Sequence, residues 1–230
     1  MQTSSAVKGE TLEDAIRVFS NYSDLIVIRH PENGAAKRAA DVTDTPVINA
    51  GDGYGEHPTQ ALLDLYTIRN RFKKLNNLTG LIAGDLLYGR TVHSLLRGFS
   101  LFSGNIIYLL SPQRLRLPRD LFERFSKKIK LIEITSEKEI PENCHFWYWT
   151  RVQKERFSDL KEYEIIKTSF VITPELLKKK GGKQTIIMHP LPRVGEIDSR
   201  VDSDRRALYL TEQIRNGLYV RMALLQLILH

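Results

Sequence analysis

The stretch from Leu81 to Leu110, LIAGDLLYGRTVHSLLRGFSLFSGNIIYLL, decides the fold class of this chain. Its first residues, Leu81-Ile-Ala-Gly, form a short apolar run typical of a buried strand, and Asn105 to Leu110 form a second such run. A helix is expected between them, over Thr91 to Phe102. A strand, a helix and another strand in this order predict parallel pairing.

The same alternation continues on both sides of this stretch. Thr11 with Asp14 three residues later resembles a capping box and predicts a helix through Phe19. Pro58 suits the first position of a long helix that ends near Phe72. Further strands are expected at 24–28, 47–49, around 132, 145–149, 170–172 and 185–188, and further helices at 35–40, 119–127 and 211–229. The pattern predicts an α/β fold with two doubly wound parallel-sheet domains.

The domain organisation follows from the long helix. We expect residues 1–57 to form a first, small unit, residues 58–72 a helix that bridges two units, residues 73–210 a second and larger unit, and residues 211–230 a C-terminal helix. No internal repeat or low-complexity tract interrupts this plan.

The composition is that of an ordinary globular protein, with 42% hydrophobic and 27% charged residues in 230. Apolar runs such as Ile106 to Leu110 are too short to cross a bilayer, and the N-terminal residues lack the pattern of a signal peptide. We therefore expect a cytoplasmic protein without a membrane partner. The single cysteine, Cys144, lies in an apolar run, which favours a buried, inert thiol and makes zinc binding improbable.

A net charge of +7 raises the question of nucleic-acid binding. The basic residues are scattered, and the runs at 69–74 and 178–183 are typical of the C-terminal ends of helices. Solvated helix ends are the favoured interpretation, and nucleic acid is not an expected partner. Individual arginines remain candidates for binding a small acidic substrate.

Candidate site residues follow the strands, because ligands of open parallel sheets bind beyond the C-terminal strand ends. Arg29 comes directly after the strand at 24–28, where its guanidinium could grip a planar anion. The alternative for Arg29 is an ordinary surface ion pair. A glycine-rich loop, residues 49–56, delivers His57 to the start of the long helix. His57 there should be neutral and could donate to a developing oxyanion, or it could simply be a helix cap.

Three later segments have the same placement. Arg90 lies near a helix start after the strand at 81–84, in a loop whose spacing does not match a dinucleotide-binding motif. Arg151 and Gln153 follow an aromatic strand and could hold a carboxylate, although such charged runs are usually solvated. His189-Pro-Leu-Pro-Arg193 has an extended backbone whose carbonyls could face a ligand amine, or is a rigid turn.

Taken together and in this order, these segments resemble the catalytic chains of the aspartate carbamoyltransferase family. The longest matching stretches are His57-Pro-Thr-Gln-Ala-Leu-Leu-Asp-Leu, Tyr88-Gly-Arg-Thr-Val-His-Ser-Leu and Thr150-Arg-Val-Gln-Lys-Glu-Arg. The resemblance covers essentially the whole chain. It implies a carbamoyl phosphate domain first, an aspartate domain second, and a C-terminal helix that packs back on the first domain.

The resemblance also implies roles for individual residues. Those that would contact carbamoyl phosphate are Arg29, His57 and Gln60. Those that would hold the two carboxylates of L-aspartate are Arg90, Arg151 and Gln153. Those that would offer backbone carbonyls are Pro190 and Leu191. Two anions must be brought together, and an amine must attack a carbonyl whose oxygen becomes negative, so arginines and hydrogen-bond donors suit the chemistry.

An oligomer is a further implication. Ser4 and Lys8 match a mobile loop that reaches into the active site of a neighbouring subunit, with Lys8 counted among the catalytic residues. The resemblance thus implies a homotrimer with shared active sites, for which regulatory chains are a further partner class. Neither a metal nor an organic cofactor is required, because carbamoyl phosphate is already activated.

The sister family, the ornithine carbamoyltransferases, shares the His-Pro-x-Gln motif but resembles a different second half. The segment that matches His189-Pro-Leu-Pro usually carries a cysteine in place of Pro190. Arg151 and Gln153 also favour a substrate with two carboxylates over ornithine, whose extra amine a second arginine would repel.

One family motif, Ser-x-Arg-Thr-Arg at a helix start that wraps the phosphate, does not occur in these residues. We therefore expect the first domain to be incomplete at its N-terminus and the chain by itself to have little transferase activity. It would be a transferase whose phosphate-binding segment is supplied elsewhere, or a non-catalytic ligand-binding or assembly protein derived from such an enzyme.

Overall fold

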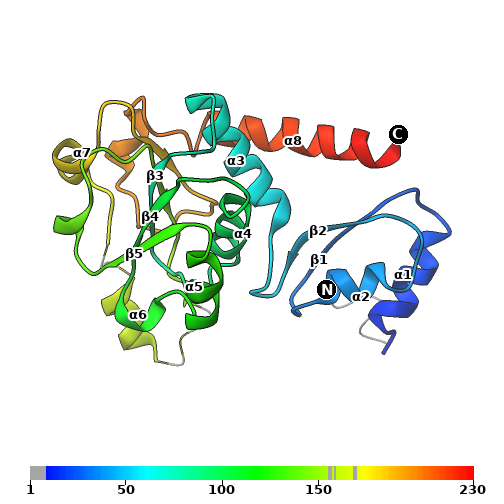
Figure 1. The fold of residues 1–230 in the computed structure, drawn as a ribbon. Helices are drawn as coiled ribbons and strands as arrows, with labels where there is room; N and C mark the ends of the chain where they lie inside the picture. Colours follow the sequence, from blue (N-terminus) through cyan, green and yellow to red (C-terminus); the bar gives the residue numbers. More distant parts are fainter. Residues whose placement is uncertain (1–8, 155–156, 158, 168–169) are drawn as a thin grey trace.

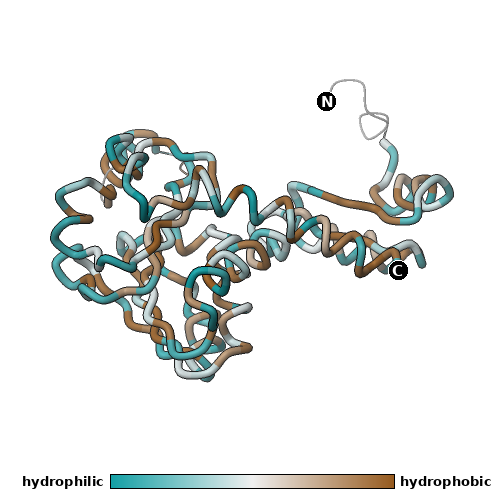
Figure 2. The backbone as a smooth tube through the Cα atoms, turned by 90° about the horizontal axis from the view of Figure 1, so that it is seen from above, coloured by the Kyte–Doolittle hydropathy of each residue, from teal (hydrophilic) through white to brown (hydrophobic). Residues whose placement is uncertain are grey.

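The structure is a computed structural model that describes residues 9–154, 157, 159–167 and 170–230. Figure 1 shows two α/β units joined by helix α3 (Pro58–Phe72). The smaller unit contains α1 (Leu12–Ser20), β1 (Ile26–His30), α2 (Ala35–Ala40) and β2 (Val47–Asp52). The view from above in Figure 2 shows this unit standing apart from the larger one.

The larger unit is built on a five-stranded parallel sheet in the order β5-β4-β3-β6-β7. Its strands are β3 (Thr79–Ala83), β4 (Ile106–Leu110), β5 (Lys130–Ile134), β6 (Phe146–Trp149) and β7 (Ile186–Met188). The chain leaves β3 toward one edge through β4 and β5, then returns to add β6 and β7 on the other side. The doubly wound arrangement places a topological switch point between β3 and β6, where ligands of such sheets bind.

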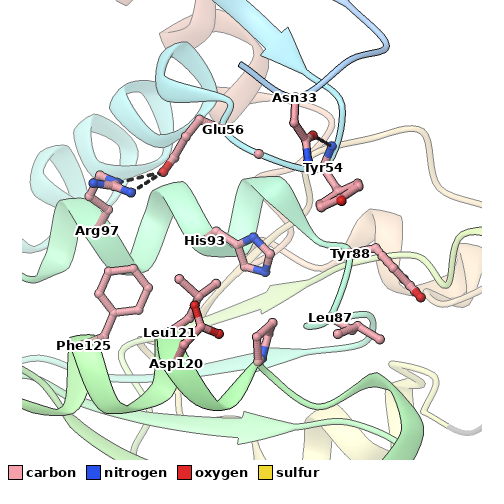
Figure 3. Close-up of a pocket in the computed structure, with 12 residues that line it drawn as sticks. Asn33, Tyr54, Glu56, Leu87, Tyr88, His93, Arg97, Asp120, Leu121 and Phe125 are labelled. Carbon is pink, nitrogen blue, oxygen red and sulfur yellow. Dashed lines mark hydrogen bonds and ion pairs between the residues drawn. The ribbon is translucent and has the colours of Figure 1, made fainter. Parts of the chain in front are cut away.

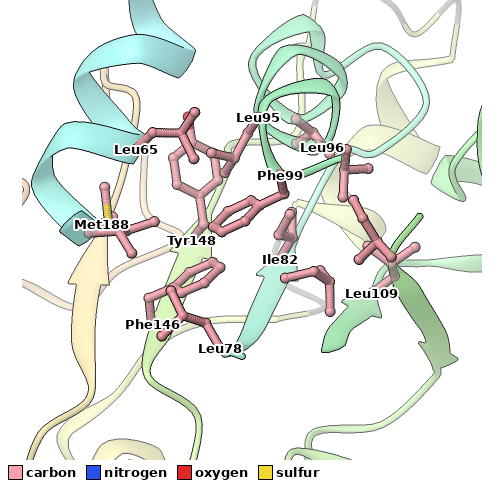
Figure 4. Close-up of a cluster of buried hydrophobic side chains, with 14 of the residues drawn as sticks. Leu65, Leu78, Ile82, Leu95, Leu96, Phe99, Leu109, Phe146, Tyr148 and Met188 are labelled. Carbon is pink, nitrogen blue, oxygen red and sulfur yellow. The ribbon is translucent and has the colours of Figure 1, made fainter. Parts of the chain in front are cut away.

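Buried side chains fill both faces of this sheet. Every residue of β6 is buried, as expected for a strand covered on both faces. On one face, the rings of Phe99 and Phe146 stack at 5.3 Å between centroids, within the apolar cluster of Figure 4. On the other face, Trp147 and Trp149 pack against residues such as Ile172 and Leu177. The smaller unit has only a minor cluster around Ile16, Ile26 and Ala39.

Helices α4 (Arg90–Phe99), α5 (Arg119–Ser126) and α8 (Glu212–Leu229) lie close to the positions that the sequence pattern predicts. Helix α6 (Leu160–Ile166) was not predicted, and for α7 (Pro174–Lys180) the sequence indicated only a basic C-terminal end at 178–183. Short 3-10 turns occur at Gln113–Leu115, Glu137–Glu139 and Ser199–Ser203. Helix α8 packs against α3 and extends in the direction of the smaller unit (Figure 1).

The α/β class with parallel sheets is confirmed, and several local predictions are corrected. The smaller unit contributes a parallel pair, β1 with β2, within the described residues. The segment 170–172 is not a strand, because Ile172 forms an isolated bridge to Ile197. Helix α4 ends at Phe99 rather than Phe102, with Ser100 as its cap. The predicted cap of α1 is correct, since the Thr11 hydroxyl accepts a hydrogen bond from the Asp14 amide at 3.1 Å.

The predicted burial of Cys144 is also correct, because its side chain is 2% exposed. Burial raises the pKa of this thiol to about 12, so it stays protonated and unreactive at neutral pH. Within the described residues, we find no helix that is both long and apolar enough to span a bilayer.

Candidate functional site

At the switch point, the loops that follow β3 and β6 contact each other. Gly84 has φ +111°, and a Cβ atom there would lie 2.1 Å from the Thr150 carbonyl oxygen, so only glycine fits. The Thr150 hydroxyl accepts from the Asp85 amide at 3.1 Å and donates to the Ala83 carbonyl at 3.2 Å. These bonds fix the start of the segment that carries Arg151 and Gln153.

Gln153 reaches back to the loop after β3. Its Nε2 donates to the Tyr88 carbonyl at 3.0 Å and lies 3.4 Å from Asp85 Oδ2, while Asp85 Oδ1 accepts from the Tyr88 amide at 2.9 Å. Arg151, half-buried, precedes it in the same segment. The loop after β3 leads directly into Arg90, so the structure connects the three residues predicted to bind carboxylates.

Arg90 is the first residue of α4, and its side chain crosses to the glycine loop of the smaller unit. Its Nη1 donates to the Gly53 carbonyl at 2.9 Å. A Cβ atom on Gly51, where φ is +117°, would lie 2.8 Å from Arg90 Cζ. The absence of a side chain at residue 51 therefore makes room for this guanidinium.

The glycine loop itself is organised by Asp52. Its carboxylate accepts from the amides of Gly34 (2.8 Å) and Glu56 (3.0 Å) and from Asn49 Nδ2 (3.1 Å). Burial acts to raise the pKa of Asp52, but these hydrogen bonds outweigh it and leave the pKa below its ordinary value. The loop that receives Arg90 thus has a fixed, charged centre.

Arg29 lies inside β1 and not after it, which corrects the predicted strand end at Ile28. The pairing shifts here, since Ile28 is opposite Asn49 and His30 is opposite Asp52. One residue of β1 therefore faces two of β2, a bulge of the kind that redirects side chains beside active sites. Arg29 is exposed.

His57 stands at the N-cap of α3, and no side-chain capping bond is present. Its backbone amide donates to Ser94 Oγ at 2.9 Å, which ties it to α4. Burial, followed by the positive charges of Arg90, Arg29 and Arg221, lowers the pKa of His57 to about 4. The imidazole is therefore neutral at physiological pH, as the sequence predicted, and a neutral imidazole can donate one hydrogen bond.

A cavity of about 160 Å³ lies against α3, α8 and the segment after β7. It is lined by three of the predicted residues, Gln60, Pro190 and Leu191, together with Arg221. Leu191 has φ +53°, a left-handed conformation that is strained for any residue with a Cβ atom and that is found at functional sites.

His189 holds this loop in place. Its Nδ1 accepts from the Leu191 amide at 2.8 Å, which leaves Nε2 to carry the ring proton, and Nε2 lies 2.7 Å from Glu196 Oε1. His189 and Glu196 are both buried. The ring thus joins the start of the loop to its end.

Arg221 was missed from the sequence. It lines the cavity and acts electrostatically on His57, so it links the two groups of predicted residues. A signal was present, because Arg221 is the lone charged residue in the apolar segment 217–229. Ser4 and Lys8, also predicted for the site, lie outside the described residues.

A larger pocket of about 410 Å³ lies beside the switch point, between the glycine loop, α4 and α5 (Figure 3). None of the predicted site residues lines it. Among the described residues that line it, Arg97 Nη2 pairs with Glu56 Oε1 at 2.6 Å, and Glu56 also accepts from the Ser94 hydroxyl, so these two charges neutralise each other. The chemistry therefore points to the smaller cavity and the arginines around His57, despite the smaller volume.

Comparisons with known proteins agree with this geometry. The family model of the aspartate/ornithine carbamoyltransferase carbamoyl-P binding domain matches residues 1–70, and that of the Asp/Orn binding domain matches residues 76–228. The aspartate carbamoyltransferase catalytic subunit of Methanococcus vannielii is 50% identical over 99% of this chain and 74% of its own length. That of Methanocaldococcus jannaschii is 48% identical over 98% of this chain and 73% of its own length.

Solved structures show the same relationship. The catalytic subunit of Methanocaldococcus jannaschii aspartate transcarbamoylase superposes with a TM-score of 0.88 at 47% identity, over 99% of this chain and 74% of that one. The Trypanosoma cruzi aspartate transcarbamoylase in complex with N-(phosphonacetyl)-L-aspartic acid gives a TM-score of 0.85 at 36% identity, over 98% and 71%. Family models match both parts of the chain, and a catalytic subunit is 50% identical to it, so the chain belongs to the aspartate carbamoyltransferase family.

Proposed function

We propose that this chain is the catalytic chain of an aspartate carbamoyltransferase of pyrimidine biosynthesis. It would transfer the carbamoyl group of carbamoyl phosphate to the amine of L-aspartate, giving N-carbamoyl-L-aspartate and phosphate. The observation that carries the proposal is the convergence of Arg90, Arg29 and Arg221 on a neutral His57 where the two units meet. Such a site suits two anionic substrates and a carbonyl that gains negative charge.

The residues would divide the work as follows. His57 donates a hydrogen bond to the carbamoyl oxygen as charge develops, and Arg29 stabilises the same anion. Gln60 and the carbonyls of Pro190 and Leu191 accept from the carbamoyl amine. The carboxylates of aspartate are bound by Arg90, Arg151 and Gln153. The aspartate amine attacks the carbamoyl carbon, the bond from that carbon to the phosphate oxygen breaks, and the proton of the amine passes to the departing phosphate.

An assay for carbamoyl aspartate tests the proposal. Carbamoyl phosphate is offered with aspartate or with ornithine to the 230-residue chain and to the same chain preceded by a relative's segment that carries Ser-x-Arg-Thr-Arg. We expect carbamoyl aspartate from the extended chain and no carbamoyl ornithine. A clear preference for ornithine, or no product from either chain, would overturn the assignment.

The glycine at residue 51 gives a prediction for aspartate binding. Gly51→Ala should raise the KM for aspartate about tenfold, since a Cβ atom 2.8 Å from Arg90 Cζ displaces the guanidinium. Gly34→Ala is the matched control, because Gly34 also has positive φ (+77°) in the same unit but would meet nothing within 4 Å. If both variants shift the KM equally, backbone strain and not Arg90 is responsible.

A cytoplasmic homotrimer with active sites shared between subunits completes the proposal, with regulatory chains as further partners. Ser4 and Lys8 would act in the site of a neighbouring subunit. Mixing Lys8→Ala and His57→Ala variants of the chain that is active in the assay for carbamoyl aspartate, each strongly impaired, should restore a fraction of the activity after subunit exchange, because some sites in mixed trimers hold both intact residues. If no activity returns while native mass spectrometry, with one variant isotopically labelled, shows mixed trimers, Lys8 acts within its own subunit.

A further inference from the structure

Asp64 is a fully buried carboxyl on α3 that has no role in the chemistry above. Polar side chains from three elements surround it: Gln60 from the preceding turn of α3, Gln213 from α8 and Tyr148 from β6. Figure 4 shows Tyr148 reaching from the sheet toward α3. A charge or a polar group in such a place is costly unless it is bonded, so the contacts of Asp64 need an explanation.

The hydrogen bonds of Asp64 fix the orientation of two amides. Its Oδ1 accepts from Gln60 Nε2 at 3.0 Å and from Gln213 Nε2 at 2.7 Å. Gln213 Oε1 in turn accepts from the backbone amide of His189 at 3.0 Å. A carboxylate oxygen can only accept, so each glutamine must turn its NH₂ group toward Asp64 and its oxygen away.

This orientation matters for the cavity beside α3. Gln60 lines it together with Pro190 and Leu191. Pro190 has no amide hydrogen and that of Leu191 is donated to His189 Nδ1, so the backbone groups that these two residues can offer a ligand are carbonyl oxygens. With Nε2 held by Asp64, Gln60 adds its own oxygen to this set of acceptors. If the Gln60 amide were turned by 180°, its NH₂ group would face the amine of a ligand, donor against donor. Its oxygen would then face Asp64 Oδ1, and the hydrogen bond between Gln60 Nε2 and Asp64 would be lost.

We propose that Asp64 is a positioning residue, which holds the Gln60 carboxamide with its oxygen toward the carbamoyl amine and, through Gln213, anchors the backbone at His189 behind Pro190 and Leu191. The inference rests on the proposed function of the site. It assigns to one side chain the alignment of acceptors that come from two distant parts of the chain.

The role does not depend on whether Asp64 is charged. Burial raises its pKa to about 7, against the opposing effects of Tyr148, Gln213, Gln60 and the charge of Arg221. Oδ1 accepts hydrogen bonds in the carboxylate and in the acid protonated on Oδ2. Asparagine offers the same acceptor, so Asp64→Asn should preserve the alignment, whereas Asp64→Leu should abolish it.

A second buried bond between the same helices provides a matched control. Asn216 Nδ2 on α8 donates to Thr67 Oγ1 on α3 at 3.0 Å, and both residues are buried. Thr67→Val keeps the shape of the side chain and removes this bond together with the one that the Thr67 hydroxyl donates to the Leu63 carbonyl at 2.7 Å. Thr67 does not line the cavity.

The experiment compares kcat and both KM values in the chain that forms carbamoyl aspartate in the assay above and in variants of that chain. We expect Asp64→Leu to raise the KM for carbamoyl phosphate about tenfold, the effect of one lost buried hydrogen bond. Asp64→Asn and Thr67→Val should stay within about twofold of the parent. In a Gln60→Met background, Asp64→Leu should add little, because the side chain that it orients is already gone.

Several outcomes would overturn the proposal. These are fully additive losses in the double variant, an equal KM shift in Thr67→Val, or a loss in Asp64→Asn as large as in Asp64→Leu. Where Asp64→Leu does not fold, Asp64→Thr replaces it, since a short hydroxyl cannot reach both amides. No carbamoyl aspartate from either chain of that assay refutes the proposed function itself, whereas an active chain with additive losses refutes only the role of Asp64.

Discussion

Replacing His57 with alanine is expected to lower the turnover of carbamoyl phosphate and aspartate by roughly 10² to 10³, the usual cost of losing one oxyanion donor. The neutral imidazole is surrounded by cations that favour negative charge on a ligand. The kcat of purified His57→Ala at saturating substrates measures the effect. A loss of less than about fivefold would remove His57 from the mechanism.

His145→Ala is the control for this variant. His145 accepts from the Thr79 amide at 3.0 Å. This contact lies at the N-terminal ends of β3 and β6, whereas the site lies beyond the C-terminal ends of the strands. Turnover by His145→Ala should match the parent. A comparable loss in both variants would point to a general effect on folding.

The lowered pKa of His57 also predicts the direction in which the stability of the protein changes with pH. Its value of about 4 in the folded protein lies below the ordinary 6.5, so between these values the unfolded chain binds more protons than the folded one. This residue therefore makes stability fall as the pH drops from 6.5 toward 4. His57→Gln should flatten that part of a plot of Tm against pH.

Replacing Arg90 with alanine should lower kcat/KM for aspartate by roughly 10². The guanidinium makes charge-assisted hydrogen bonds, each contributing about 1.5 to 3 kcal/mol when desolvated. Arg90→Lys should recover only part of the loss, because an ammonium keeps the charge and lacks the planar fork. Steady-state kinetics with aspartate as the varied substrate provide the measurement.

The control for Arg90 is Arg119→Ala. Arg119 pairs with Glu123 on the exposed face of α5 at 2.8 Å, and such surface pairs contribute little. Its kinetics should equal those of the parent. Should Arg90→Ala bind aspartate as well as Arg119→Ala does, the carboxylate site lies elsewhere.

The sequence by itself determined the α/β class and most element positions. Short apolar runs between turn residues, such as Ile106–Leu110, favour buried strands, and Thr11 and Pro58 mark helix starts through local chemistry. The same local rules failed at 170–172, where an apolar run pairs at a single bridge. Local pattern also placed His57 at a helix start, and the family motifs supplied its neighbours.

Only the tertiary structure decided how these residues act together. The low pKa of His57 needs burial and three cations, of which Arg221 comes from the last helix. The orientation of Gln60 depends on Asp64, and that of Gln213 on both Asp64 and His189. Electrostatic and hydrogen-bond energies depend on distance in space, and no local pattern encodes the distance between residues 60 and 213. That distance is set by the packing of α3 against α8.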